Sequence, residues 1–206
     1  MTYAVAGLGW LAAYLAPEGS RQRSSTSIVA VLFSAMAIDD HAYLHERVGP
    51  MLRSMAERSS LTEWIAAYPS YFWQVSVAPI YGVLGCYSAW FLWKNVEHRR
   101  VRWLPLLAVL CWIGAVGLDF AEGLDAHTPG HPYTRLAQGY GMQEFAQATF
   151  DRQPYDMIVH FGRVVEECLE TTGVVLFGAA ILLLVGQSVG RVRRQVATAT
   201  ESVVDA

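Results

Sequence analysis

Hydrophobic residues in this chain are gathered into long blocks that carry almost no charge, and polar segments separate these blocks. The apolar blocks lie at about residues 1–16, 27–44, 71–93, 103–119 and 171–189. Uncharged runs of roughly 20 residues are typical of helices that cross a membrane, because a helix satisfies its own backbone hydrogen bonds in lipid. The pattern therefore predicts an all-α integral membrane helical bundle with four to five transmembrane helices.

The number of predicted transmembrane helices is four or five because the first apolar block is short. A helix over residues 1–16 would reach only about 24 Å, which is less than the hydrocarbon core of a bilayer, about 30 Å thick. We expect a single membrane-embedded helical domain over residues 1–196, and a frayed cytoplasmic tail over residues 197–206. The polar stretch at residues 126–154 reads as an extramembrane loop with a short helix near residues 142–150.

Basic residues predict the orientation of the spans. Nine of the 15 lysines and arginines lie in three short segments, at residues 21–23, 94–102 and 191–194. Lysine and arginine are enriched in cytoplasmic loops, so these segments and the C-terminus are expected in the cytoplasm. The chain is then a multi-pass protein of the cell membrane, and its acidic segments face the extracytoplasmic side.

Composition narrows the classes of partner. Of the 206 residues, 53% are hydrophobic, and the formal net charge is −3. No basic stripe lies outside the short loops, so nothing supports nucleic-acid binding. The three cysteines are far apart and sit in or beside apolar blocks, which indicates buried thiols. Membrane lipid is the expected surrounding, and a lipid-like molecule is the expected substrate class.

Three groups of ionisable residues share the extracytoplasmic ends of different predicted helices. They are Asp39, Asp40, His41, His45 and Glu46; Asp119, Glu122 and Asp125; and His160, Glu166, Glu167 and Glu170. An isolated charge at membrane depth costs about 2.5–3.5 kcal/mol on insertion scales, and like charges four residues apart on a helix repel. Solvated helix ends are one interpretation, and Arg163 could neutralise one carboxylate. A bound cation is the other interpretation.

Carboxylates and imidazoles that project from facing helices are the usual ligands of two-metal sites in helical bundles. The predicted metal ligands are Asp40, His45, Asp119, Glu122, His160, Glu167 and Glu170. The Glu-x-x-His pairs of soluble di-iron bundles are absent, so the expected cofactor is a divalent metal, either zinc or iron. Glu46 and Glu166 are the candidates for a catalytic general base.

The pattern Asp-Asp-x-x-x-x-His-Glu at residues 39–46, followed by Glu-Glu-x-x-Glu at residues 166–170, resembles a group of bacterial multi-span membrane proteins of unknown function. This resemblance implies a membrane-spanning helical fold and brings no activity with it.

The function that these observations favour is a metal-dependent membrane enzyme, either a hydrolase or a di-metal oxidoreductase, acting on a lipid-like substrate from the outer leaflet. A cation- or proton-coupled transporter is one alternative, because carboxylates at membrane depth serve such carriers as ion sites. A non-catalytic membrane subunit or scaffold is the other. The sequence leaves open whether the protein is an enzyme.

Overall fold

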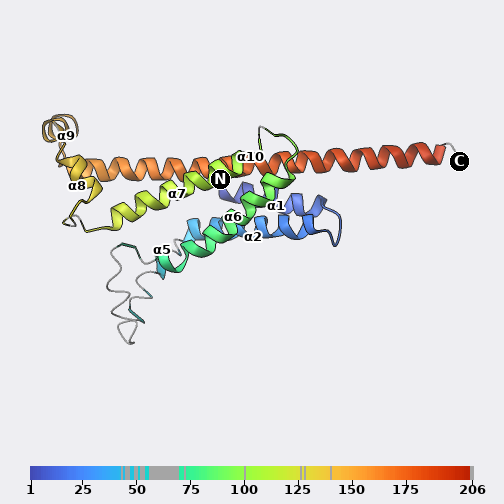
Figure 1. The fold of residues 1–206 in the computed structure, drawn as a ribbon, viewed down its shortest axis with the longest axis horizontal. Helices are drawn as coiled ribbons and strands as arrows, with labels where there is room; N and C mark the ends of the chain where they lie inside the picture. Colours follow the sequence, from blue (N-terminus) through green and yellow to red (C-terminus); the bar gives the residue numbers. More distant parts are fainter. Residues whose placement is uncertain are drawn as a thin grey trace. The chain divides into compact units, whose positions relative to one another are not determined.

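The computed structural model describes residues 1–42, 44, 47–48, 51, 54–55, 70–71, 73–99, 101–125, 127, 129–139 and 141–204. Every regular element in this part of the chain is a helix, as the apolar blocks predict. The elements are α1 (Thr2–Leu15), α2 (Arg21–Ala42), α5 (Trp73–Ser76), α6 (Ala78–Asn95), α7 (Leu104–Gly123), α8 (Pro132–Ala137), α9 (Met142–Phe150) and α10 (Pro154–Val204) (Figure 1). The bounds of α9 confirm the short helix predicted at residues 142–150.

The helices are divided between two compact units, whereas the sequence reads as one domain over residues 1–196. Unit 1 comprises residues 1–42, 81–109 and 173–206, and unit 2 comprises residues 43–80 and 110–172. The helices α7 and α10 each contribute residues to both units. Each unit is therefore described by itself.

In unit 1, α1 packs directly against α2 (Figure 1). A side chain at Gly9 would bring a Cβ atom to 3.0 Å from the Cα of Ala30, so glycine permits the close approach of the two helices. The indole Nε1–H of Trp10 donates to the hydroxyl of Ser34 at 3.2 Å, and that hydroxyl donates to the Ala30 carbonyl at 2.8 Å. Ser34 is thus a helix-packing residue.

The C-terminal part of α10 completes the apolar interior of unit 1. The ring of Phe177 meets Phe33 of α2 edge to face, with centroids 5.4 Å apart, and both side chains are fully buried. Val5 of α1 lies against Gly178, where an added Cβ atom would be 3.0 Å from its methyl group. Helices from both ends of the chain therefore share one core.

In unit 2, a close contact joins α8 to the first part of α10. A Cβ atom added at Gly162 would lie 2.6 Å from the hydroxyl of Tyr133, so only glycine leaves room for the tyrosine ring. That hydroxyl donates to the carbonyl of Leu118 in α7 at 3.3 Å. The rings of Phe150 and Phe161, 5.9 Å apart, attach the end of α9 to α10.

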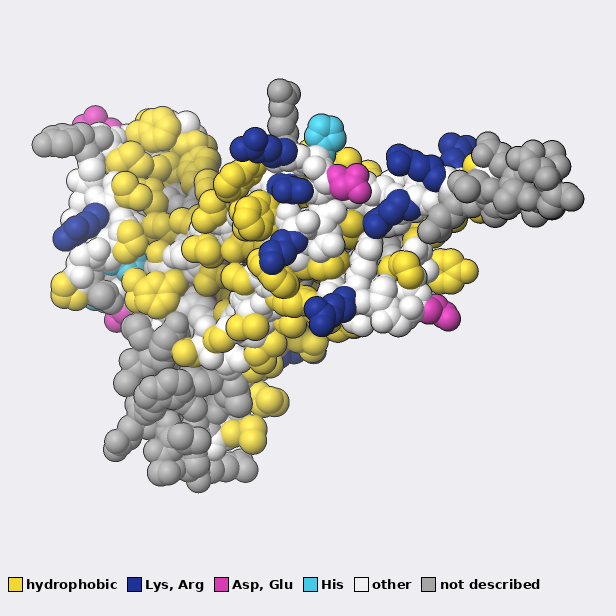
Figure 2. All heavy atoms as spheres, turned by 45° about the vertical axis from the view of Figure 1, so that its right-hand side comes forward, with side chains coloured by type: hydrophobic (Ala, Val, Ile, Leu, Met, Phe, Trp, Pro, Cys, Tyr) yellow, Lys and Arg dark blue, Asp and Glu magenta, His cyan; other side chains and the backbone are white. Residues whose placement is uncertain are grey.

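Two described helices are long and apolar enough to cross a membrane: α7, and α10 between Pro154 and Arg194. In the most apolar window of α7 only 17% of the residues are buried, whereas the core helix of a water-soluble protein hides most of its apolar side chains. Leu110 and Ile113 are each 62% exposed. Figure 2 shows hydrophobic side chains spread over the visible surface, and such exposed apolar area fits contact with lipid.

The structure moves several predicted boundaries. The expected span at residues 71–93 is interrupted between α5 and α6, where Pro79 lies in the first turn of α6 and has no N–H to continue a preceding helix. Helix α2 begins at Arg21, since the hydroxyl of Ser20 accepts the N–H of Arg23 at 3.1 Å as a cap. Helix α10 extends far beyond residues 171–189 at both ends, and reaches Val204 through most of the segment expected to fray.

Candidate functional site

Carboxylates from two helices gather in unit 2. Asp119 and Glu122 are three residues apart on α7 and so share one face of that helix. Glu166 and Glu170 are four residues apart on α10 and lie near them, together with Arg163. We call these five residues the polar cluster. It brings together members of two of the three groups predicted from the sequence.

Within the polar cluster, Glu122 is paired with Arg163. The guanidinium Nε–H of Arg163 donates to Glu122 Oε2 at 2.8 Å, and its second nitrogen donates to Oε1. The hydroxyl of Tyr71 also donates to Oε1, at 3.3 Å. The Glu122 side chain is only 12% exposed, while that of Arg163 is 60% exposed. A forked contact of this kind fixes the carboxylate firmly.

Asp119 receives its hydrogen bonds from α5. The indole Nε1–H of Trp73 donates to Asp119 Oδ2 at 3.0 Å, and the side-chain amide of Gln74 donates to the same oxygen at 2.7 Å. The hydroxyl of Ser70 donates to the carbonyl of Phe120 at 3.0 Å, which holds this segment against the end of α7. Protein donors therefore stabilise the negative charge of Asp119.

Glu166 is the half-buried carboxylate of the polar cluster. The negative charges of Asp119, Glu170 and Glu122 repel that of Glu166, and the positive charge of Arg163 attracts it. Arg163 is already hydrogen-bonded to Glu122, so its guanidinium offsets only part of the negative charge that acts on Glu166. The arrangement leaves negative charge in excess around Glu166.

Tyr133 of α8 lies beside the polar cluster. Its side chain is buried, and its hydroxyl donates to the Leu118 carbonyl. Burial, followed by the negative charges of Glu122 and Glu166, raises the pKa of the Tyr133 phenol above its ordinary value. The phenol therefore stays protonated near neutral pH and serves as a hydrogen-bond donor.

The remaining predicted ligands lie elsewhere or outside the described residues. His160 is exposed, with its ring 6.0 Å from that of Phe161, and Glu167 is also exposed. The backbone of Asp40 belongs to α2 in unit 1, while its side chain, His45 and Glu46 fall outside what the structure describes. Within the described part of the chain, no three His, Cys, Asp or Glu side chains are placed to hold a metal ion. The metal site stays a prediction.

Sequence reasoning missed the donors to Asp119. In the sequence, Trp73 is interpreted as a residue of an aromatic belt at the membrane interface. Gln74 belongs to no motif that would indicate a contact with Asp119. The one available signal is that a carboxylate placed beyond an apolar run must find hydrogen-bond donors.

A family model described as "Domain of unknown function (DUF8692)" matches residues 1–185. The chain belongs to this family. No curated protein and no solved structure matches it. Membership in DUF8692 agrees with the expected resemblance to a family without an assigned activity, so any function has to be argued from the polar cluster and the apolar helices.

Proposed function

We propose that this DUF8692 protein is an integral membrane protein of four to five spans, and that Glu166 binds and releases a proton in the polar cluster. Glu166 precedes the segment at residues 171–189 that is proposed to cross the membrane. The observation that carries the proposal is the crowding of Glu166 by three carboxylates, while Arg163 is hydrogen-bonded to one of them.

Carboxylates that lie close together repel one another when all of them are ionised. Binding a cation, either a proton or a metal ion, relieves this repulsion. A proton needs only one carboxyl group, whereas a metal ion needs several converging ligands. Asp119 and Glu122 already accept hydrogen bonds from protein donors, and Glu170 is exposed, so Glu166 is the proposed acceptor for the proton. This reasoning favours proton binding over a metal held by the described residues alone.

The proposed activity is that of a membrane enzyme in which Glu166 is the general base. A general base must accept a proton near the operating pH and lie within reach of its substrate. A divalent metal, if the enzyme uses one, would draw on Glu170, Glu167 and His160, together with His45 and Glu46. Lipid-like molecules are the proposed substrate class, because the helices that carry the cluster expose apolar side chains.

A proton-coupled carrier is the second candidate, since it too needs an exchangeable carboxyl group. It would require ionisable groups along the spanning helices. The stretches 104–118 and 173–185 contain no Asp, Glu, His, Lys or Arg, so the chain offers no route of ionisable side chains along these helices. The enzyme is therefore the preferred proposal.

Glu166→Gln tests the role of the carboxylate in purified full-length protein. Removing one like charge from the polar cluster should raise the free energy of unfolding by about 1 kcal/mol, as is common when a functional residue that strains its site is replaced. The matched control is Glu144→Gln on the exposed surface of α9, which should change stability little. Thermal unfolding in mild detergent measures both variants.

The same experiment separates a proton from a metal. If a metal binds at the cluster, zinc or ferrous ion should raise the melting temperature of the wild type and not that of Glu170→Gln, which lacks a proposed ligand. Equal melting temperatures with and without metal would leave the proton as the cation. A marked loss of stability in Glu166→Gln would show that the carboxylate is structural, and the proposal would be wrong.

A further inference from the structure

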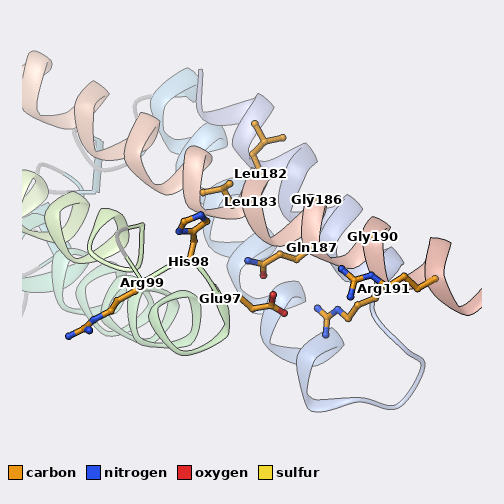
Figure 3. Close-up of a pocket in the computed structure, with 10 residues that line it drawn as sticks. Glu97, His98, Arg99, Leu182, Leu183, Gly186, Gln187, Gly190 and Arg191 are labelled. Atoms are coloured by element: carbon orange, nitrogen blue, oxygen red, sulfur yellow. The ribbon is translucent and has the colours of Figure 1, made fainter.

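Unit 1 contains a groove of about 640 Å³ between the α6–α7 connection and the C-terminal part of α10. The connection contributes residues 97–99, and α10 contributes residues between 182 and 194 (Figure 3). None of these residues belongs to the polar cluster, which lies in unit 2. The groove is therefore a separate feature.

The groove is basic at its polar end. Arg191 and Arg194 line this end together with the carboxylate of Glu97. Arg99 and His98 also line the groove, but in Figure 3 His98 lies beside Leu183 and Arg99 extends away from Arg191. Figure 2 shows that arginine and lysine side chains gather on this face. Arginine binds phosphate through paired N–H donors, so the charge of the groove suits an anionic phosphate group.

The other end of the groove is apolar. Leu182 and Leu183 line it about two to three helical turns before the arginines of α10, and their side chains are 56% and 37% exposed. Gly186 and Gly190 lie between the two ends, and a Cβ atom at either position would meet nothing within 4 Å. The surface thus changes from apolar to basic along one helix face, with room left beside the glycines.

Gln187 adds a polar group inside the groove. Its amide oxygen is buried and has no hydrogen-bond partner among the described residues. A buried acceptor without a donor is unfavourable, so a bound molecule with a hydroxyl group would stabilise it. Figure 3 shows the Gln187 side chain extending from α10 on the side that faces His98 and Glu97.

We infer that the groove binds an anionic phospholipid with a hydroxylated headgroup. The phosphate would contact Arg191 and Arg194, a headgroup hydroxyl would donate to Gln187, and an acyl chain would lie along Leu182 and Leu183. Basic pockets beside membrane helices bind anionic headgroups in this way. The inference depends on the proposed membrane location and on none of the proposed chemistry at Glu166.

The test uses full-length protein purified in neutral detergent. Native mass spectrometry measures the binding of phosphatidylglycerol and of phosphatidylcholine with the same acyl chains. Wild-type protein should prefer phosphatidylglycerol, and each arginine removed should weaken that binding about fivefold. Arg191→Gln combined with Arg194→Gln should therefore lower it roughly twentyfold. The matched control, Arg135→Gln combined with Arg152→Gln on exposed sites of unit 2, changes the net charge equally and should bind as the wild type does.

Gln187→Leu separates the headgroup hydroxyl from the phosphate. This variant should lose several-fold in affinity for phosphatidylglycerol and keep its affinity for phosphatidic acid, which lacks the headgroup glycerol. Unchanged binding of phosphatidylglycerol by the groove variants would overturn the inference. Equal competition by inorganic phosphate at the same concentration would also overturn it, because the apolar half of the groove would then contribute nothing.

Alkaline extraction of membranes distinguishes this failure from failure of the proposed function. Protein that stays in the membrane fraction but binds both lipids equally would refute only the lipid groove. Protein released into the soluble fraction would refute the membrane location, and the lipid groove with it.

Discussion

Arg163→Gln should destabilise unit 2 by removing the partner of Glu122. The carboxylate of Glu122 accepts two hydrogen bonds from the guanidinium of Arg163, and its side chain is only 12% exposed. The substitution puts a shorter, neutral amide in place of the guanidinium, and so removes both the charge and the forked contact. Among the described residues, Glu122 then keeps the hydrogen bond from the hydroxyl of Tyr71, at 3.3 Å. The crowding of Glu166 also increases, because the guanidinium is gone.

The size of the effect follows from the burial of the two partners. Breaking a fully buried ion pair costs about 3–5 kcal/mol. Here the Arg163 side chain is 60% exposed, so water can replace part of the lost interaction. We expect Arg163→Gln to lower the free energy of unfolding by about 2 kcal/mol, and Glu122→Gln by about 1 kcal/mol. The double variant should lose less than the sum, with a coupling energy of about 1 kcal/mol.

The double-mutant cycle compares four proteins: the wild type, Arg163→Gln, Glu122→Gln and the double variant. Their thermal unfolding in mild detergent is monitored by tryptophan fluorescence and by circular dichroism. Arg152→Gln is the control, because Arg152 is exposed in unit 2. Its stability should stay within about 0.5 kcal/mol of the wild type. A coupling energy near zero, or equal effects of Arg163→Gln and Arg152→Gln, would refute the pairing of α7 with α10 through these side chains.

Two further predictions concern the packing around the cluster. Asp119→Leu should leave the indole N–H of Trp73 without its acceptor and cost about 2 kcal/mol. A change in the tryptophan emission spectrum would report the loss, and an unchanged spectrum and melting temperature would argue against the contact. Gly162→Ala should cost about 1–3 kcal/mol, because its Cβ atom would lie 2.6 Å from the hydroxyl of Tyr133. Gly117→Ala, which meets nothing within 4 Å, is the control and should unfold at the wild-type temperature or above it.

Much of the helical content could be predicted from the sequence because the signal lies within each segment. Long uncharged blocks predict helices, and the bounds of α9 follow from a short periodic stretch within a polar loop. The interruption between α5 and α6 has a local signal too, since Pro79 cannot donate a backbone hydrogen bond. The continuous apolar character of residues 71–93 hides that signal.

The partners within the polar cluster could not be predicted, because the contacts join distant segments. Hydropathy places Asp119 and Glu166 at a similar depth, but a shared depth does not say which side chains meet. Arg163 was expected to neutralise a carboxylate, and the structure identifies that carboxylate as Glu122, 41 residues away. The donor from Trp73 lies 46 residues from Asp119, and no sequence period connects them.

Infrared difference spectroscopy tests the central claim most directly. The full-length protein, reconstituted in phospholipid vesicles, is compared between acidic and alkaline buffer, and Glu166→Gln is measured beside the wild type. The wild type should show the C=O stretch of a protonated carboxyl group that persists to neutral pH, and this band should be missing from Glu166→Gln but present in Glu144→Gln. Identical difference spectra for all three proteins would contradict the claim that Glu166 holds an exchangeable proton.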